Sequence, residues 1–261
     1  MRGPPWQHGA MADPAGPGPR RGFDGADLRG ARFVRSDLSG VVMRAVDVAG
    51  ADIDAPWLLD GESSLLVNGV DVVPFVEAEL DRRFPGRDRR RATDPEGLRA
   101  AWAALEDTWA ATLARVAAMP AGTVEVSVDG EWSFAQTLRH LVMATDTWLR
   151  RAVLRLEQPF HPIGQPNAEY ATDGHDLSVF SAVTPSYAQV LEVRAERQAM
   201  VRGHLATVTA DDLRAVRRNP WAEHPETVLS CLHTILEEEW EHHRFAVRDL
   251  DAIEAAGLAV P

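Results

Sequence analysis

Glu239 and His243 stand four residues apart near the C-terminus, and both side chains are of types that bind metal ions. The surrounding segment, residues 229–250, has apolar residues at helical spacing, and Glu239 and His243 continue that apolar stripe through its middle. An ionised carboxylate facing apolar packing is costly, so Glu239 must be protonated, paired or bound to a cation. Two interpretations follow: half of a metal site, or a buried pair of Glu239 with a histidine or an arginine.

A third metal ligand would have to come from another helix. His140 lies at the edge of the apolar face of a predicted helix over residues 133–149. Taken alone, such a residue is typical of a core or boundary histidine. With Glu239 and His243, it would complete a three-ligand site that keeps one position open. Glu238 and His242, on the flank of the stripe, are interpreted as surface residues, with a supporting contact to the metal ligands as the alternative.

Composition narrows the classes of function. The chain has 261 residues and a net charge of −12, which argues against binding to a nucleic-acid backbone. It has no apolar run of about 20 residues and no signal-peptide pattern, so we expect a cytoplasmic protein that does not enter a membrane. The single cysteine, Cys231, excludes an intrachain disulfide and is expected to pack as a small hydrophobic residue.

The N-terminal part changes character near residue 22. Residues 1–21 are rich in Pro and Gly and are expected to form a disordered leader. Residues 22–60 then repeat every five positions, with apolar residues at Phe23, Leu28, Phe33, Leu38, Met43, Val48 and Ile53. Neither a helix nor a flat strand has this period. The runs from Gly25 and Gly50 resemble pentapeptide repeats, and this resemblance implies a short right-handed β-solenoid with four repeats per coil.

Residues 61–93 connect this module to the rest of the chain. Asn68-Gly69 between two apolar runs predicts a type I′ hairpin. A short amphipathic helix is expected over residues 74–84. Residues 82–91 are rich in arginine and are interpreted as a solvated linker, with a binding patch for an anionic partner as the alternative.

Residues 94–257 predict a mainly α domain of four long helices. Asp94 and Pro95 begin the first helix, and a capping box of Ser133 and Gln136 begins the second. The third helix begins at residues 184–185, and the fourth runs from residue 225 to a C-cap at Gly257. A small ribbon is expected around residues 126–130. Because residues 158–183 form one long polar crossover, the expected fold is a four-helix bundle whose sites form between facing helices.

Two segments carry a resemblance to a known family. Residues 132–141, with His140, and residues 238–244, with Glu239 and His243, resemble the DinB-like four-helix superfamily, in which one histidine and an H-x-x-x-H pair hold a metal. Glu239 departs from the all-histidine pattern. The set of His, Glu and His is similar instead to the arrangement in the mycothiol-dependent maleylpyruvate isomerase branch. The resemblance implies a zinc site of His140, Glu239 and His243, with nickel or iron as alternatives.

The resemblance also implies a reaction. A thiol such as mycothiol would bind the metal as co-substrate and attack a small electrophile, which makes the chain a thiol-dependent transferase or isomerase. The alternatives are a non-enzymatic metal-binding, stress-response or interaction module, and a metal-dependent hydrolase. Small-molecule thiols and electrophiles are thus the expected partners, and the resemblance allows a homodimer.

Overall fold

The structure is a computed structural model, and it describes residues 22–59, 63–168 and 170–257. The expected leader over residues 1–21 lies outside them. The described residues divide into two compact units, one up to Pro56 and one from Trp57 onward. Each unit is considered by itself.

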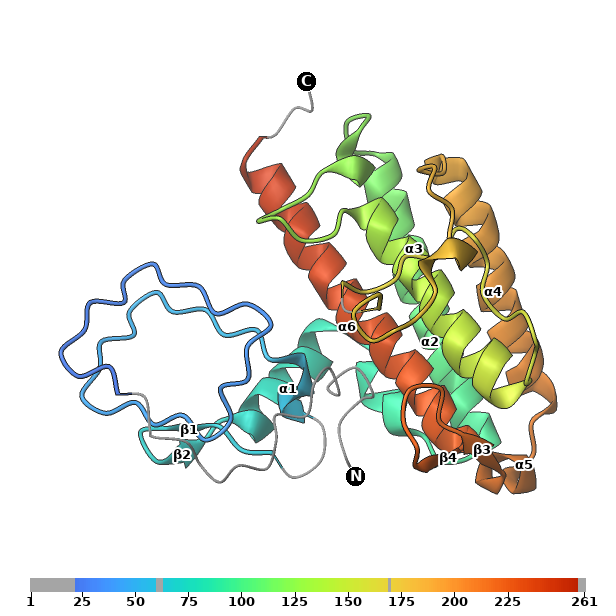
Figure 1. Cartoon of the computed structure of the whole chain (residues 1–261), viewed down its shortest axis with the longest axis horizontal. Helices are drawn as coiled ribbons and strands as arrows, with labels where there is room; N and C mark the ends of the chain where they lie inside the picture. The colour runs from blue at the N-terminus through green and yellow to red at the C-terminus, as the bar shows by residue number, and fades with distance from the viewer. Residues whose placement is uncertain (1–21, 60–62, 169, 258–261) are drawn as a thin grey trace. The chain divides into compact units, whose positions relative to one another are not determined.

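Turns follow the five-residue period in the first unit. Positive φ angles recur at Gly25, Gly30, Arg35, Gly40, Ala45 and Gly50. Backbone hydrogen bonds of 3.0 Å close equivalent turns, such as that from Ala31 N to the carbonyl of Leu28. Within residues 22–55 no strand is assigned and every residue is exposed, and Figure 1 shows this segment as open rounds of chain. The repeat is therefore present, whereas a packed β-solenoid is not shown.

A 3₁₀ helix, Pro56–Leu59, spans the boundary between the two units, and a small hairpin follows in the second unit. Strand β1 (Leu66–Val67) pairs antiparallel with β2 (Val70–Asp71). Asn68 and Gly69 between them have φ angles of 51° and 82°, as the predicted type I′ turn requires. Helix α1 (Val73–Arg83) follows directly.

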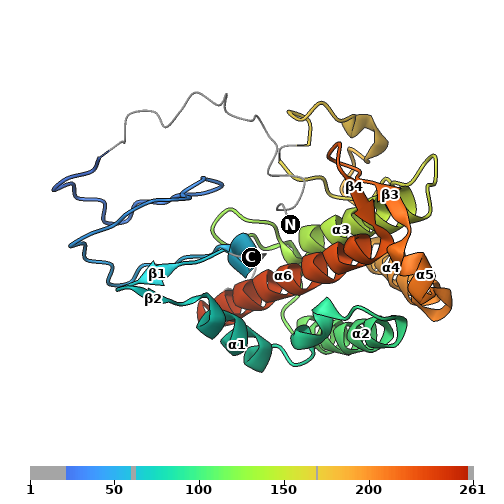
Figure 2. The ribbon, with the colours of Figure 1, turned by 90° about the horizontal axis from the view of Figure 1, so that it is seen from below.

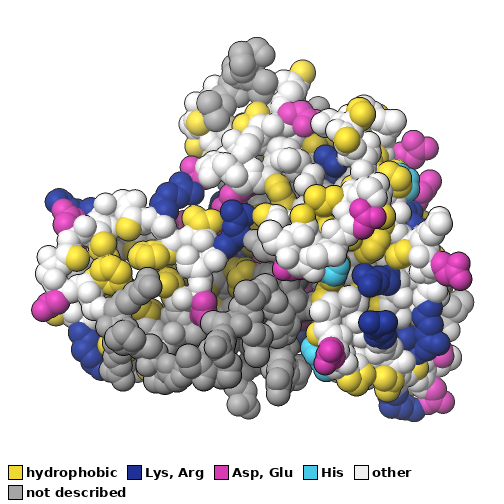
Figure 3. All heavy atoms as spheres, viewed as in Figure 1, with side chains coloured by type: hydrophobic (Ala, Val, Ile, Leu, Met, Phe, Trp, Pro, Cys, Tyr) yellow, Lys and Arg dark blue, Asp and Glu magenta, His cyan; other side chains and the backbone are white. Residues whose placement is uncertain are grey.

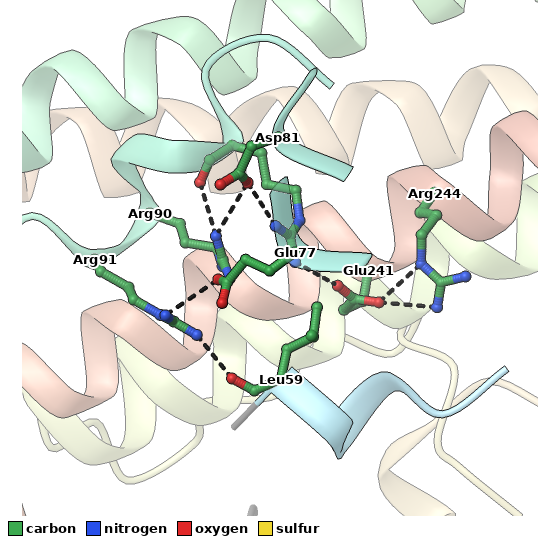
Figure 4. A network of polar contacts seen from close by, with 8 residues as sticks. Leu59, Glu77, Asp81, Arg90, Arg91, Glu241 and Arg244 are labelled. Atoms are coloured by element: carbon green, nitrogen blue, oxygen red, sulfur yellow. Dashed lines mark hydrogen bonds and ion pairs between the residues drawn. The ribbon is translucent and has the colours of Figure 1, made fainter. Parts of the chain in front are cut away.

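The arginine-rich segment after α1 is not a solvated linker. Residues Arg87–Arg91 form a 3₁₀ helix, and the side chains of Arg87 and Arg90 are buried. Arg87 Nη1 lies 2.6 Å from Asp81 Oδ1. Arg90 Nη2 lies 2.6 Å from Glu77 Oε1 (Figure 4). The linker interpretation was wrong because acidic side chains of α1 neutralise these arginines, which then pack beneath it.

Four long helices form the bundle. They are α2 (Pro95–Ala117), α3 (Phe134–Thr145), α4 (Tyr187–Thr207) and α6 (Val228–Ala255). Helix α3 contacts both α4 and α6, and α2 contacts the same two helices (Figures 1 and 2). A π-helical segment, Asp146–Val153, continues α3 without a break. The core between the helices is rich in aromatic and aliphatic side chains, among them Trp102, Trp109, Leu138, Leu141 and Trp240.

The predicted starts of the first two long helices are confirmed, whereas the third, α4, begins at Tyr187 after the N-cap Ser186 and not at residues 184–185. The Asp94 carboxylate accepts hydrogen bonds from the backbone N–H groups of residues 96 and 97, and Ser133 and Gln136 form the predicted capping box. Gly257 has a φ of 56°, which suits the predicted C-cap. The bundle with one long crossover, mainly α, is the fold that the sequence predicts.

Short elements differ from the prediction. Residues Thr123–Glu125 form a 3₁₀ helix, and no strand is assigned around residues 126–130, so the expected ribbon is not present in this described part of the chain. A 3₁₀ turn at Leu177–Val179 interrupts the crossover. After a short α5 (Ala210–Arg214), strand β3 (Val216–Arg218) pairs antiparallel with β4 (Pro225–Thr227). The last helix therefore begins at Val228, after the strand that contains Pro225.

Candidate metal centre

Three side chains of metal-binding type meet between α3 and α6. They are His140 from α3 and Glu238 and His242 from α6, and one potential ligand atom of each lies within 4.8 Å of the others. His140 Nε2 is 3.5 Å from Glu238 Oε2, and His242 Nδ1 is 3.4 Å from the same oxygen. The exposed fractions of the side chains are 14%, 13% and 14% in that order. The group is thus screened from bulk water but can be reached from it.

Hydrogen bonds to backbone carbonyls orient both imidazole rings. His140 Nδ1 lies 2.9 Å from the carbonyl oxygen of Gln165, which belongs to the crossover, and His242 Nδ1 lies 2.8 Å from the carbonyl oxygen of Glu238. Because a carbonyl only accepts, each Nδ1 donates its proton to that carbonyl, which leaves Nε2 as the nitrogen of His140 that faces Glu238. This is the tautomer that the outer contacts of metal-binding histidines commonly fix.

Aromatic rings surround the two histidines. The Trp132 ring centroid lies 4.6 Å from that of His140, and the His140 and His242 centroids are 4.7 Å apart. Phe245 packs edge to face against His242 at 5.8 Å. Burial, reinforced by neighbouring His140, lowers the pKa of His242 to about 4. His242 is therefore neutral at pH 7, the state in which an imidazole binds a metal.

Glu239, one residue further along α6, lies in the bundle core. Its side chain is 1% exposed, which confirms that the apolar stripe directs it inward. It forms an ion pair with Arg194 of α4, whose side chain is 3% exposed and whose guanidinium lies 5.8 Å from the Trp109 ring centroid. Burial raises the pKa of Glu239, and the Arg194 charge opposes that shift. The pairing of Glu239 thus follows the second interpretation of the sequence, a buried glutamate–arginine pair.

His243 is also buried, with 3% of its surface exposed. Its Nε2 lies 2.8 Å from Thr112 Oγ1, and its ring meets the Trp109 ring edge to face at 4.9 Å. Burial lowers the pKa of His243 to about 4. Of the expected ligands, the structure places only His140 in the group that could hold a metal, among the residues described. A cation bound by Glu239 would also face the Arg194 guanidinium, which repels it.

The sequence contains a pattern that indicates Glu238 and His242 as metal-ligand candidates, although both were interpreted as surface residues. They have the same four-residue spacing as Glu239 and His243 and lie at the edge of the apolar stripe. His140 also lies at the edge of its own apolar face. Because helices meet solvent at the edges of their packed faces, an edge histidine on α3 indicates partners at the edge of α6.

The profile of the DinB superfamily matches residues 104–246, and that of pentapeptide repeats matches residues 23–54 with eight copies. No curated protein and no solved structure matches the chain. The DinB match covers more than half of the sequence and spans all three side chains of the group between α3 and α6. The chain therefore belongs to the DinB superfamily and carries a pentapeptide-repeat segment ahead of that domain.

Proposed function

We propose that the chain binds one divalent metal ion through His140, Glu238 and His242. The observation that carries this proposal is the approach of three ligand atoms to within 4.8 Å of one another. The chemistry of the donors fits a cation, since two imidazoles and a carboxylate are ligands that zinc accepts. Nickel and iron also accept this set, so zinc is the first metal to test.

The protein's own groups prepare this site. The Gln165 carbonyl holds the His140 ring so that Nε2 faces Glu238, and Trp132 shields one side of the pair of rings. Three protein ligands leave a fourth position open on a tetrahedral ion. When bound, the metal would supply positive charge that favours the thiolate form of a thiol, or the hydroxide form of water, at neutral pH.

The proposed reaction is thiol-dependent transfer or isomerisation of a small electrophile, with a low-molecular-weight thiol of the mycothiol type as co-substrate. Membership of the DinB superfamily supports a metal-dependent role. The chain's only cysteine supports an external thiol, because Cys231 is fully buried and burial raises the pKa of its thiol to about 12. A thiol in that state is a poor nucleophile at neutral pH, so the reacting sulfur must come from solution.

The test is turnover of a model electrophile by zinc-loaded protein, with and without mycothiol. We expect product only when thiol is present, and we expect His242→Ala to lower the rate at least tenfold. His243→Ala serves as the neighbouring control and should keep the rate per folded molecule. Turnover without thiol would instead indicate a hydrolase. Zinc binding without any turnover would indicate a non-enzymatic metal-binding protein.

A further inference from the structure

A second candidate site lies at the far end of the bundle. A pocket of about 430 Å³ opens between the π-helical end of the α3 helix and strand β3. Four arginines line it, Arg151 and Arg155 from the helix side and Arg217 and Arg218 from the strand. Figure 3 shows basic side chains gathered on this side of the molecule. Arg151 follows His140 by eleven residues along one continuous helix, a rise of about 16 Å along the helix axis.

None of these four arginines forms an ion pair within the described part of the chain. No carboxylate in the described part of the chain lies within ion-pair distance of any of them, although acids outnumber bases by 39 to 27 in the sequence. Arg217 instead donates to the backbone carbonyls of Val153 and Val216, and Arg151 lies 5.7 Å from the Trp221 ring centroid. By contrast, arginines elsewhere in the unit, such as Arg87, Arg115 and Arg197, are paired with acids.

Placing four positive charges around one pocket is unfavourable unless something compensates them. The partial negative charge at a helix C-terminus stabilises arginines there, which accounts for Arg151 and Arg155. It does not account for Arg217 and Arg218, because they belong to a strand. Arg151, Arg155 and Arg218 are exposed and Arg217 is half-buried, so water screens their mutual repulsion, and a bound anion would reduce it further.

We propose that this arginine pocket binds a small molecule that carries phosphate groups. Guanidinium groups bind phosphate through two parallel hydrogen bonds, and one diphosphate offers enough oxygens for several of them. The volume is in the range of small-ligand sites, and Ala152 and Leu156 add apolar surface for the body of such a molecule. A nucleic-acid backbone is a poor alternative because the net charge of −12 repels it.

The experiment is calorimetric titration of the full chain with pyrophosphate at low salt. Bound metal is removed first by dialysis, because pyrophosphate also binds metal ions. We expect one site per chain, and we expect the double variant Arg151→Gln/Arg218→Gln to weaken binding at least tenfold. Arg214→Gln is the matched control, since this exposed arginine is close in sequence, pairs with Asp211 and does not line the pocket. It should change the affinity less than twofold.

Three results would overturn the proposal. The first is no heat of binding up to millimolar pyrophosphate. The second is equal affinity in the wild type and the double variant, with thermal melting showing both folded. The third is tighter binding of citrate than of pyrophosphate, because the pocket would then select carboxylates over phosphates.

Discussion

Glu238 and Glu239 are adjacent, yet replacing each by glutamine should affect different properties of the protein, zinc affinity in one case and stability in the other. Glu239→Gln leaves the Arg194 guanidinium, which is 3% exposed, without its carboxylate. Removing one partner of a buried ion pair costs about 3–5 kcal/mol. For a protein of this size that loss lowers the melting temperature by roughly 6–20 °C. Glu239→Gln should nevertheless keep its zinc affinity.

Glu238→Gln should behave in the opposite way. Its side chain is 13% exposed, and its loss should change the free energy of unfolding of the metal-free protein by less than about 1 kcal/mol. The substitution removes the only carboxylate of the proposed ligand set. Since loss of an outer contact alone costs about 10- to 100-fold in metal affinity, loss of this ligand should cost more than about 100-fold, or about 2.7 kcal/mol.

The two assays are thermal melting of metal-free protein and competition with a zinc-binding dye. The double variant Glu239→Gln/Arg194→Met removes both buried charges and should recover most of the lost stability, which also provides a folded control for the titration. Loss of zinc binding in Glu239→Gln together with its retention in Glu238→Gln would instead assign the metal to Glu239. A melting temperature of Glu239→Gln within about 2 °C of the wild type would contradict the buried ion pair with Arg194.

Two further predictions concern stability. The pKa of His243 is about 4 in the folded protein and 6.5 for an ordinary histidine, so the unfolded chain binds more protons between these values. Stability should fall as the pH drops from about 6.5 to 4, by up to about 1.4 kcal/mol per pH unit. The free energy of unfolding, measured by urea titration at several pH values, should depend less steeply on pH for His243→Phe than for the wild type. An unchanged pH dependence would contradict the buried neutral ring. Gly86 has a φ of 95°, and an added Cβ would lie 2.8 Å from Ala104 Cβ, so Gly86→Ala should cost about 2 kcal/mol or more. Gly203→Ala, inside α4 with open space around it, should instead stabilise by about 0.5–1 kcal/mol, and equal melting temperatures for both variants would contradict this.

Features that depend on local chemistry could be predicted from the sequence. The caps at Asp94 and Ser133 and the turn at Asn68-Gly69 need only residues close in the chain, and all three are confirmed. The apolar stripe of the last helix also predicts correctly that Glu239 and His243 are buried. In each case the signal is a spacing within one element, and the element forms as its own sequence indicates.

Features that depend on distant partners could not be predicted in this way. Arg87 and Arg90 look solvated in sequence, and only the packing of α1 against the following 3₁₀ helix brings Asp81 and Glu77 to them. Similarly, Pro225 is a favourable first residue of a helix, but the backbone around it pairs with β3 instead. For the same reason the sequence alone could not identify the partner of Glu239, since Arg194 is 45 residues away in sequence.

The arrangement of α6 explains why the residues in the centre of its stripe and those at its edge differ in role. Side chains one residue apart on a helix diverge by about 100°. Burying Glu239 against Arg194 and His243 against Thr112 therefore fixes the rotation of α6 about its axis. That rotation turns Glu238 and His242 toward His140, at an edge that solvent can reach. A metal site that receives substrate needs this access, and the centre of the core cannot provide it.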